Sequence, residues 1–249
     1  SVTVALGQTK TCTITNDDQQ AFIIVDKTVI NNNGGTASPN DFFLTVDGNP
    51  ALDGIPVPVN PGVHTAGETP LPGYTAGPFG GDCAPNGSVT VALGQTKTCT
   101  ITNDDQAGTL RIKKTTLDGF GDTFTFVAGG PSASLITGTT LTTSAPTFMD
   151  LVEIEVNSGS YFLSEVQRPA RWTQVSAICS DVTDPQNPII LSTNPSSLPF
   201  TIGPGQVVEC VFTNQRTGTI EITKVVQGGD DRFTFVIDNG PSPRIIQSK

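Results

Sequence analysis

An eighteen-residue block occurs twice in the chain without a single difference, and it restricts the possible folds more than any other feature. Residues 1–18 and residues 88–105 both read SVTVALGQTKTCTITNDD. Identical blocks at a domain-sized offset indicate a tandem array of domains rather than one globular enzyme. A third, diverged copy at residues 205–215 keeps the Cys-x-x-x-Asn spacing in Cys210 and Asn214. We therefore expect each copy to end one domain.

The second half of the block has the alternation of a β-strand. Cys99, Ile101 and Asn103 fall on one face, and threonines fall on the other. Threonine on the wet face and Cys or Ile on the dry face describe a half-buried antiparallel strand. The carboxamide of Asn103 is therefore predicted to point into the core.

Composition favours an all-β chain. The 249 residues include 26 Gly and 19 Pro but one Met and one Trp, and strand-like segments recur between Gly, Pro and Asn. Short strands at this spacing are typical of β-sandwiches. We predict tandem Ig-like β-sandwich domains.

The repeats divide the chain into four parts. Residues 1–18 are predicted to be the C-terminal hairpin of a truncated repeat, and residues 216–249 the first strands of a further one. Residues 19–105 and residues 106–215 are predicted to be complete sandwiches, joined by short linkers into a semi-rigid rod. The partial repeats fit two alternatives: a window on a longer polypeptide, or ends completed by strands from neighbouring chains.

Charge and hydropathy exclude several partners. The formal net charge is -10 and the isoelectric point is about 4.4, which argues against a nucleic-acid surface because phosphate contacts need clustered Lys and Arg. No apolar run is long enough to cross a bilayer, so we expect no membrane insertion of this segment. We expect no cofactor.

Five cysteines fall into register when the repeats are aligned. The alignment pairs Cys83 with Cys99 and Cys179 with Cys210, and it leaves Cys12 alone. Disulfides within domains predict an oxidising setting, extracellular or at the cell surface. No CxxC, CxxH or histidine cluster suggests zinc.

Each complete repeat places three polar side chains on inward-facing strand positions. These sets are Lys27, Glu68 and Asn103, and then Lys114, Glu165 and Asn214. Burial lowers the pKa of a lysine, so that its amine can become neutral and nucleophilic. A protonated glutamic acid beside it would polarise the Asn carboxamide, and attack would expel ammonia and leave an isopeptide bond. The alternative is a buried hydrogen-bond network of the same three groups.

These motifs resemble a known family. A first-strand Lys, the run Glu-Thr-Pro-Leu-Pro-Gly-Tyr that ends at Tyr74, and a last-strand Thr-Asn are similar to collagen-adhesin B-type, or SpaA-like, prealbumin-like domains. The resemblance covers essentially the whole chain as repeats. It implies shafts of bacterial pili or stalks of adhesins, with a Lys/Glu/Asn crosslink in each domain. The second repeat departs from the pattern, because Glu165 is followed by Val-Gln-Arg-Pro-Ala-Arg-Trp without the Gly-Tyr.

We therefore predict a structural module of an extracellular bacterial filament, pilus-like fibre or surface stalk, whose partners are copies of itself or adjacent repeats. An alternative is an adhesin module that binds a host or matrix ligand through the polar, Pro-rich loop at residues 181–197. An enzyme is not expected, because no convergent catalytic set is present beyond the crosslinking residues. Acidic residues near the domain junctions are weak calcium candidates or solvated turns: Asp104, Asp105, Asp118 and Asp122.

Overall fold

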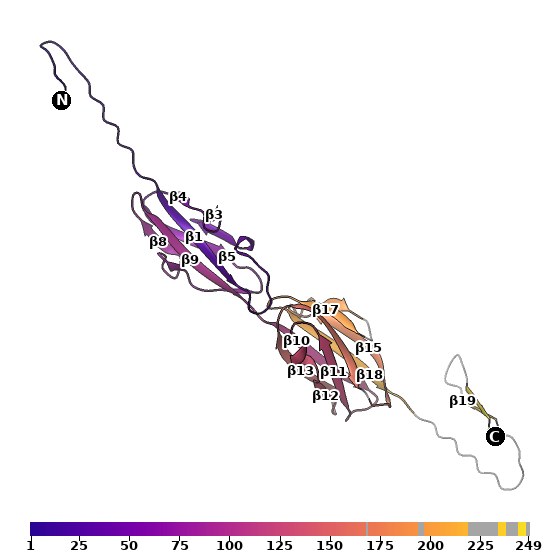
Figure 1. Ribbon diagram of the computed structural model, residues 1–249. Helices are drawn as coiled ribbons and strands as arrows, with labels where there is room; N and C mark the ends of the chain where they lie inside the picture. Colours follow the sequence, from indigo (N-terminus) through magenta and orange to yellow (C-terminus); the bar gives the residue numbers. More distant parts are fainter. Residues whose placement is uncertain (168, 194–196, 219–233, 238–243, 248–249) are drawn as a thin grey trace, which may run out of the picture. The chain divides into compact units, whose positions relative to one another are not determined.

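The computed structural model describes residues 1–167, 169–193, 197–218, 234–237 and 244–247. The chain forms two compact units, Ser1–Arg216 and Thr217–Lys249. The predicted all-β architecture is confirmed, since the described elements are strands apart from two short helical turns (Figure 1). No helix among the described residues has the length and apolarity needed to cross a membrane. Most of the fourth predicted part, residues 216–249, lies outside the described residues.

The first sandwich consists of two sheets, one with strand order β4-β1-β9-β6, in which β7 also pairs with β9, and one with order β3-β2-β5-β8. A single turn of 3₁₀ helix, Pro39–Asp41, precedes β2. The strands are β1 (Ala21–Ile30), β2 (Phe43–Val46), β3 (Asn49–Ala51), β4 (Val57–Val59), β5 (Gly62–Thr69), β6 (Tyr74–Ala76), β7 (Gly80–Gly81), β8 (Ser88–Val91) and β9 (Thr96–Asp105).

The second sandwich repeats this plan with sheets β13-β10-β18-β15-β16 and β12-β11-β14-β17. Its elements are β10 (Gly108–Leu117), β11 (Thr123–Gly129), α1 (Ala133–Ile136), β12 (Thr140–Thr142), β13 (Met149–Val156), β14 (Gly159–Gln167), β15 (Trp172–Asp181), β16 (Ile189–Ser192), β17 (Leu198–Ile202) and β18 (Val207–Arg216). In the second unit, β19 (Thr234–Ile237) pairs antiparallel with β20 (Arg244–Gln247).

The first and last strands of each sandwich are parallel neighbours. In the first domain β1 pairs with β9, so that Lys27 lies opposite Ile101 and Val29 opposite Asn103. In the second domain β10 pairs with β18, and Lys114 lies opposite Phe212. Only two residues separate β9 from β10. This pairing brings the ends of each domain's chain into one sheet.

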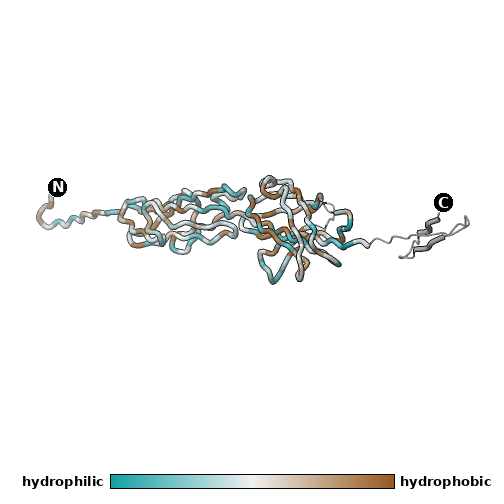
Figure 2. Tube along the Cα trace, turned by 90° about the horizontal axis from the view of Figure 1, so that it is seen from below, coloured by the Kyte–Doolittle hydropathy of each residue, from teal (hydrophilic) through white to brown (hydrophobic). Residues whose placement is uncertain are grey.

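Each sandwich has its own apolar core. Hydrophobic and hydrophilic residues follow one another along the strands (Figure 2). In β9 the predicted alternation is confirmed, because Cys99, Ile101 and Asn103 are buried while Thr100 and Thr102 are exposed. The inward faces of both sheets therefore supply the core.

The repeated block does not form the predicted hairpin. In its second copy β8 pairs with β5 and β9 pairs with β1, so its two strands belong to opposite sheets. The turn between them, closed by a hydrogen bond from Gln95 N to Ala92 O (3.1 Å), crosses the sandwich. This arch lets Val89 and Val91 face Cys99 across the core, whereas a hairpin would place them in one sheet.

The first copy of the block forms no strand. Residues 1–20 are exposed and carry no strand, so the hairpin predicted for residues 1–18 is not formed. The strands that pair with the second copy are β1, β5, β6 and β7, and all of them come from earlier in its own repeat.

The segment at residues 181–197 is only partly a loop. Asp181 ends β15, and Ile189–Ser192 form β16, which pairs antiparallel with β15 at the sheet edge. Residues 194–196 lie outside the described residues. The run at 189–191 contains two β-branched isoleucines, which favour a strand and explain this departure from the predicted loop.

Candidate crosslinking site

Three strands of the first sandwich deliver the predicted polar side chains to one buried point. Lys27 comes from β1, Glu68 from β5 in the facing sheet, and Asn103 from β9. The Lys27 Nζ lies 2.8 Å from Glu68 Oε2, and Asn103 Nδ2 donates a hydrogen bond to Glu68 Oε1 at 2.6 Å. The Lys27 side chain is fully buried and the Glu68 side chain is 3% exposed. One carboxylate therefore contacts both the amine and the carboxamide.

The second sandwich repeats this geometry. Lys114 Nζ lies 2.8 Å from Glu165 Oε2, and Asn214 Nδ2 donates to Glu165 Oε1 at 2.7 Å. Lys114 Nζ also donates to the Phe212 carbonyl oxygen at 3.4 Å. The side chains of Lys114 and Glu165 are both fully buried. Two domains with diverged sequences thus build the same three-residue site.

Strand register explains why the lysine and the asparagine meet. Lys27 and Asn103 sit on adjacent parallel strands and are offset by two residues in register. Residues two apart on a strand face the same side, and neighbouring strands lie about 4.8 Å apart. Both side chains therefore enter the core side by side, where a glutamate from the facing sheet reaches them.

An aromatic ring covers each lysine. The Phe42 ring centroid lies 4.2 Å from Lys27 Nζ, and the Phe124 centroid lies 4.3 Å from Lys114 Nζ. A ring face attracts a cation and excludes water at the same time. The distance from each phenylalanine to its lysine depends on how the two sheets pack, so no pattern along a single strand marks it.

Trp172 takes the place of the missing tyrosine in the second domain. Tyr74 packs edge-on against Phe42 with centroids 5.5 Å apart, and Trp172 packs edge-on against Phe124 at 5.8 Å. The indole also donates a hydrogen bond to Asp122 Oδ2 at 2.6 Å. The departure from the Gly-Tyr motif therefore preserves an aromatic support behind the ring over the lysine.

Burial governs the electrostatics of the site. Loss of solvation lowers the pKa of Lys27, while its contact with Glu68 and the charge of Asp53 act in the opposite direction. Lys27 Nζ and Glu68 Oε2 form an ion pair. Within the described part of the chain, the buried Oδ1 atoms of Asn103 and Asn214 have no hydrogen-bond partner. Among the described residues, no donor therefore blocks the carboxamide carbonyl oxygen of either asparagine.

The structure contains both predicted disulfides. Cys83 bonds to Cys99 of β9, and Cys179 of β15 bonds to Cys210 of β18. Each therefore attaches the last strand of its domain to a segment earlier in the chain. Cys12 is free and exposed.

The four calcium candidates are not brought together. Asp105 accepts hydrogen bonds from the backbone N–H groups of Asn33 and Gly35 in the first domain, whereas Asp122 forms an ion pair with Arg171 in the second. Asp118 accepts from a glutamine side chain, and Asp104 lies beside Asp105 on β9, where alternation turns their side chains to opposite faces. Across the described residues, no group of three or more His, Cys, Asp or Glu side chains forms a candidate metal site.

Comparison with known proteins agrees with this architecture. Family models described as prealbumin-like fold domains match residues 18–101 and residues 110–216, which together make up more than half of the chain. No curated protein matched the sequence.

Similar solved structures share little sequence with the chain. The Bacillus anthracis TIE protein is 14% identical over 80% of this chain and 34% of its own, with a TM-score of 0.41. The major pilin of Streptococcus pyogenes is 12% identical over 82% of this chain and 100% of its own, with a TM-score of 0.35. The pilus adhesin SpaC of Lactobacillus rhamnosus GG is 14% identical over 78% of this chain and 31% of its own, with a TM-score of 0.35. The chain thus spans about a third of the TIE protein and of SpaC.

Proposed function

Because the chain belongs to the family of tandem SpaA-like, prealbumin-fold domains, we propose that it is a structural module of an extracellular filament, pilus-like fibre or surface stalk. We propose further that an isopeptide bond between Lys and Asn strengthens each domain. The observation that carries this proposal is the buried Lys/Glu/Asn site, whose corresponding distances in the two sandwiches agree to within 0.1 Å.

The crosslinking step balances without a cofactor. Lys27 gives a proton to Glu68, and the neutral Nζ attacks the Cγ of Asn103. As the Nζ–Cγ bond forms, Glu68 first delivers its proton to Nδ2 and then, as a carboxylate again, takes a second proton from the attacking nitrogen. The Cγ–Nδ2 bond then breaks, and ammonia leaves with the surplus proton. The reaction occurs once in each domain, so it is a self-modification and not a turnover.

The strand arrangement gives this bond a mechanical role. Tension on a tandem chain pulls the start of β1 and the end of β9 apart, which would shear their parallel ladder of hydrogen bonds. A bond from Lys27 to Asn103 joins these two strands directly. The Cys83–Cys99 disulfide lies within the stretch that this bond would bypass. Force would therefore pass through covalent bonds without unfolding the sandwich.

Intact mass after disulfide reduction tests the proposal. The wild-type chain is expected to be lighter than its sequence by one ammonia for each domain, and Lys27→Ala and Lys114→Ala are each expected to recover one. Lys113→Ala is the matched control, because this half-buried lysine sits next to Lys114 on β10 and outside the site. A wild-type mass equal to that of the sequence would refute the crosslink and leave the buried hydrogen-bond network as the role of these residues.

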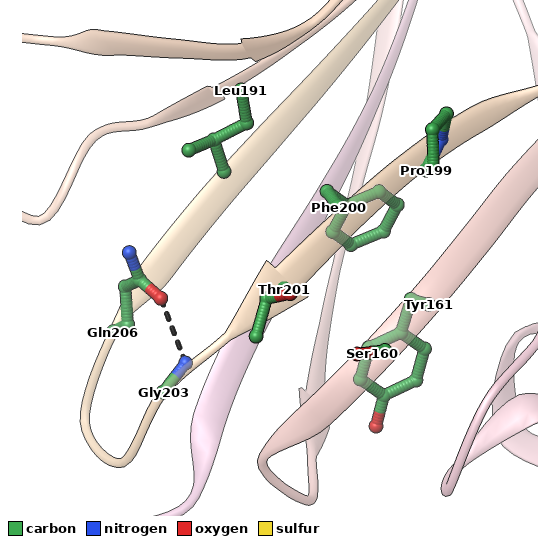
Figure 3. A pocket seen from close by; sticks show the side chains of 8 residues that line it. All are labelled: Ser160, Tyr161, Leu191, Pro199, Phe200, Thr201, Gly203 and Gln206. Carbon is green, nitrogen blue, oxygen red and sulfur yellow. Dashed lines mark hydrogen bonds between the residues drawn. The ribbon is translucent and has the colours of Figure 1, made fainter.

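A second candidate function, ligand binding, has one observation in its favour. A hollow of about 620 Å³ opens beside the 181–197 segment, and Leu191 of β16 lines it together with Tyr161, Phe200 and Gln206 (Figure 3). Phe200 and Tyr161 are stacked, with centroids 5.8 Å apart. Adhesion lost in a Leu191→Glu variant, with fibres intact, would favour the adhesin module, whereas fibres lost with adhesion would favour assembly. Ile189→Glu, on the same strand and outside the lining, is the control.

A further inference from the structure

The two crosslinking sites differ at the sheet edge beside the lysine. In the second domain β13 pairs with β10 from Gly108 to Thr115. In the first domain β4 pairs with β1 only from Ala21 to Ile23. The chain between β3 and β4 takes over beyond that point, where Gly54 N donates to the Val25 carbonyl oxygen at 2.9 Å.

Asp53 supplies the next contact along this edge. Lys27 N donates a hydrogen bond to Asp53 Oδ1 at 2.7 Å, so a carboxylate stands where a strand partner would present its carbonyl. In the second domain the residue opposite Lys114 is Asp150, and its carboxylate accepts instead from the N–H groups of Thr142 and Leu151. The lysine backbone is therefore held by a side-chain carboxylate in the first domain and by a strand ladder in the second.

The carboxylate also acts on the lysine amine. The groups around Lys27 are the Glu68 carboxylate from the facing sheet, the neutral Asn103 carboxamide, the Phe42 ring and Asp53 at the edge. The negative charge of Asp53 raises the pKa of Lys27 and so opposes the lowering caused by burial. Proton loss from the amine, which must precede attack, is therefore made harder by Asp53.

We propose that Asp53 is a positioning residue for the first domain's crosslink: its hydrogen bond fixes the Lys27 backbone at an otherwise unpaired edge, and its charge delays proton release from the amine. This inference rests on the proposed isopeptide function. It gives Asp53 two separable effects, because the hydrogen bond speeds the reaction and the charge slows it.

Asp53→Asn separates the two effects, since the carboxamide keeps an acceptor oxygen and removes the charge. Full-length chains recovered unfolded and uncrosslinked from inclusion bodies would be refolded across mildly acidic to mildly alkaline pH, quenched in denaturant and reduced. Mass spectrometry of digests would then count the Lys27–Asn103 and Lys114–Asn214 peptides separately. Asp26→Asn, exposed on β1, is the control that removes one charge outside the core.

The expected result is that Asp53→Asn forms the Lys27–Asn103 bond roughly threefold faster at neutral pH, with its pH profile displaced to lower pH, as a weak charge effect would produce. Asp26→Asn and the second-domain crosslink should keep wild-type rates. Asp53→Ala, which loses the acceptor, should crosslink more slowly than Asp53→Asn at every pH.

Two outcomes would overturn this inference, and they can be told apart. If the Lys114–Asn214 and Lys27–Asn103 peptides both form but Asp53→Asn keeps the wild-type pH profile, Asp53 has no charge effect and the inference alone fails. If neither crosslinked peptide forms in the wild-type chain, the proposed crosslinking and the inference about Asp53 are both refuted.

Discussion

Replacing Glu68 with Gln tests the physical reasoning behind the site most directly. The substitution keeps the size of the side chain and its hydrogen bond from Asn103 Nδ2, but it removes the charge that lies 2.8 Å from Lys27 Nζ. The Lys27 side chain is fully buried, so its charge would then lie in the core without the carboxylate that balances it. The variant should also lose the proton carrier, and with it the crosslink.

The expected loss of stability follows from burial. Removing one partner of a buried ion pair costs about 3–5 kcal/mol, whereas an exposed pair contributes about 0–1 kcal/mol. Glu153 forms such an exposed pair with Arg111, and its side chain is 54% exposed. For a domain of this size, Glu68→Gln should therefore lower the melting temperature of the first sandwich by roughly 10 °C more than Glu153→Gln lowers that of the second.

Calorimetry of the full chain is the assay, and in each variant the unchanged sandwich provides the reference transition: the second sandwich for Glu68→Gln and the first for Glu153→Gln. Asn103→Ala separates the two losses, since it removes the crosslink but keeps the Lys27–Glu68 pair. In Glu68→Gln the pKa of Lys27 is lowered by burial and no longer supported by the carboxylate. The unfolded chain then binds more protons than the folded one, so the variant's stability should rise as pH rises toward the ordinary lysine pKa.

If Glu68→Gln and Glu153→Gln lower the melting temperatures of their own sandwiches by amounts within a degree or two of each other, the claim that burial makes the Lys27–Glu68 pair important for stability is refuted. Retained loss of ammonia in the same variant would refute the role of Glu68 as the proton carrier. Either result can be read independently of the other, because one is a melting temperature and the other a mass.

Two further predictions concern stability in the first domain. Replacing Cys83 and Cys99 with Ser, which opens a bridge spanning 16 positions, should cost about 3 kcal/mol in the chain-entropy description, measured by urea unfolding; an unchanged midpoint would contradict it. The hydrogen bond of His64 Nδ1 to Asp47 (2.7 Å) raises the pKa of His64. The stabilisation by the His64–Asp47 pair is therefore fully present below the ordinary histidine pKa and is lost as pH rises through the raised pKa of His64. The urea midpoint of the wild-type chain should fall over that pH range, whereas the midpoint of His64→Gln should not. An equal pH dependence in both chains would contradict a stabilising role for this pair.

Much of the site could be predicted because strand alternation is a strictly local property. Period two on β1 and β9 placed Lys27 and Asn103 inward, and the repeats aligned each with its counterpart in the second domain. The same alignment paired Cys179 with Cys210. In each case the prediction needed only the alternation along one strand or the match between two copies of the repeat.

Features that depend on which strands pair could not be predicted in this way. The hairpin predicted for the repeated block is an arch between two sheets, because β8 pairs with β5 and not with β9. The edge-on contact of Trp172 with Phe124, which corresponds to that of Tyr74 with Phe42, depends on how the sheets pack. The hydrogen bond from the Lys27 backbone to Asp53 joins residues 26 positions apart at a sheet edge that no local pattern marks.

The sequence by itself determined the tandem all-β organisation, the disulfide pairs and the inward position of each Lys, Glu and Asn, because repetition and alternation act along the chain. Tertiary structure alone decided that the first and last strands are parallel neighbours, and that a carboxylate from the facing sheet contacts both amine and carboxamide. Residues 88–105 show the division most clearly: their alternation is visible in the sequence, but their two strands lie in opposite sheets because β8 pairs with β5 and β9 pairs with β1. The tendency of a segment to form a strand depends on its own residues, but its hydrogen bonds come from strands distant in sequence, so the segment alone does not determine which strands pair.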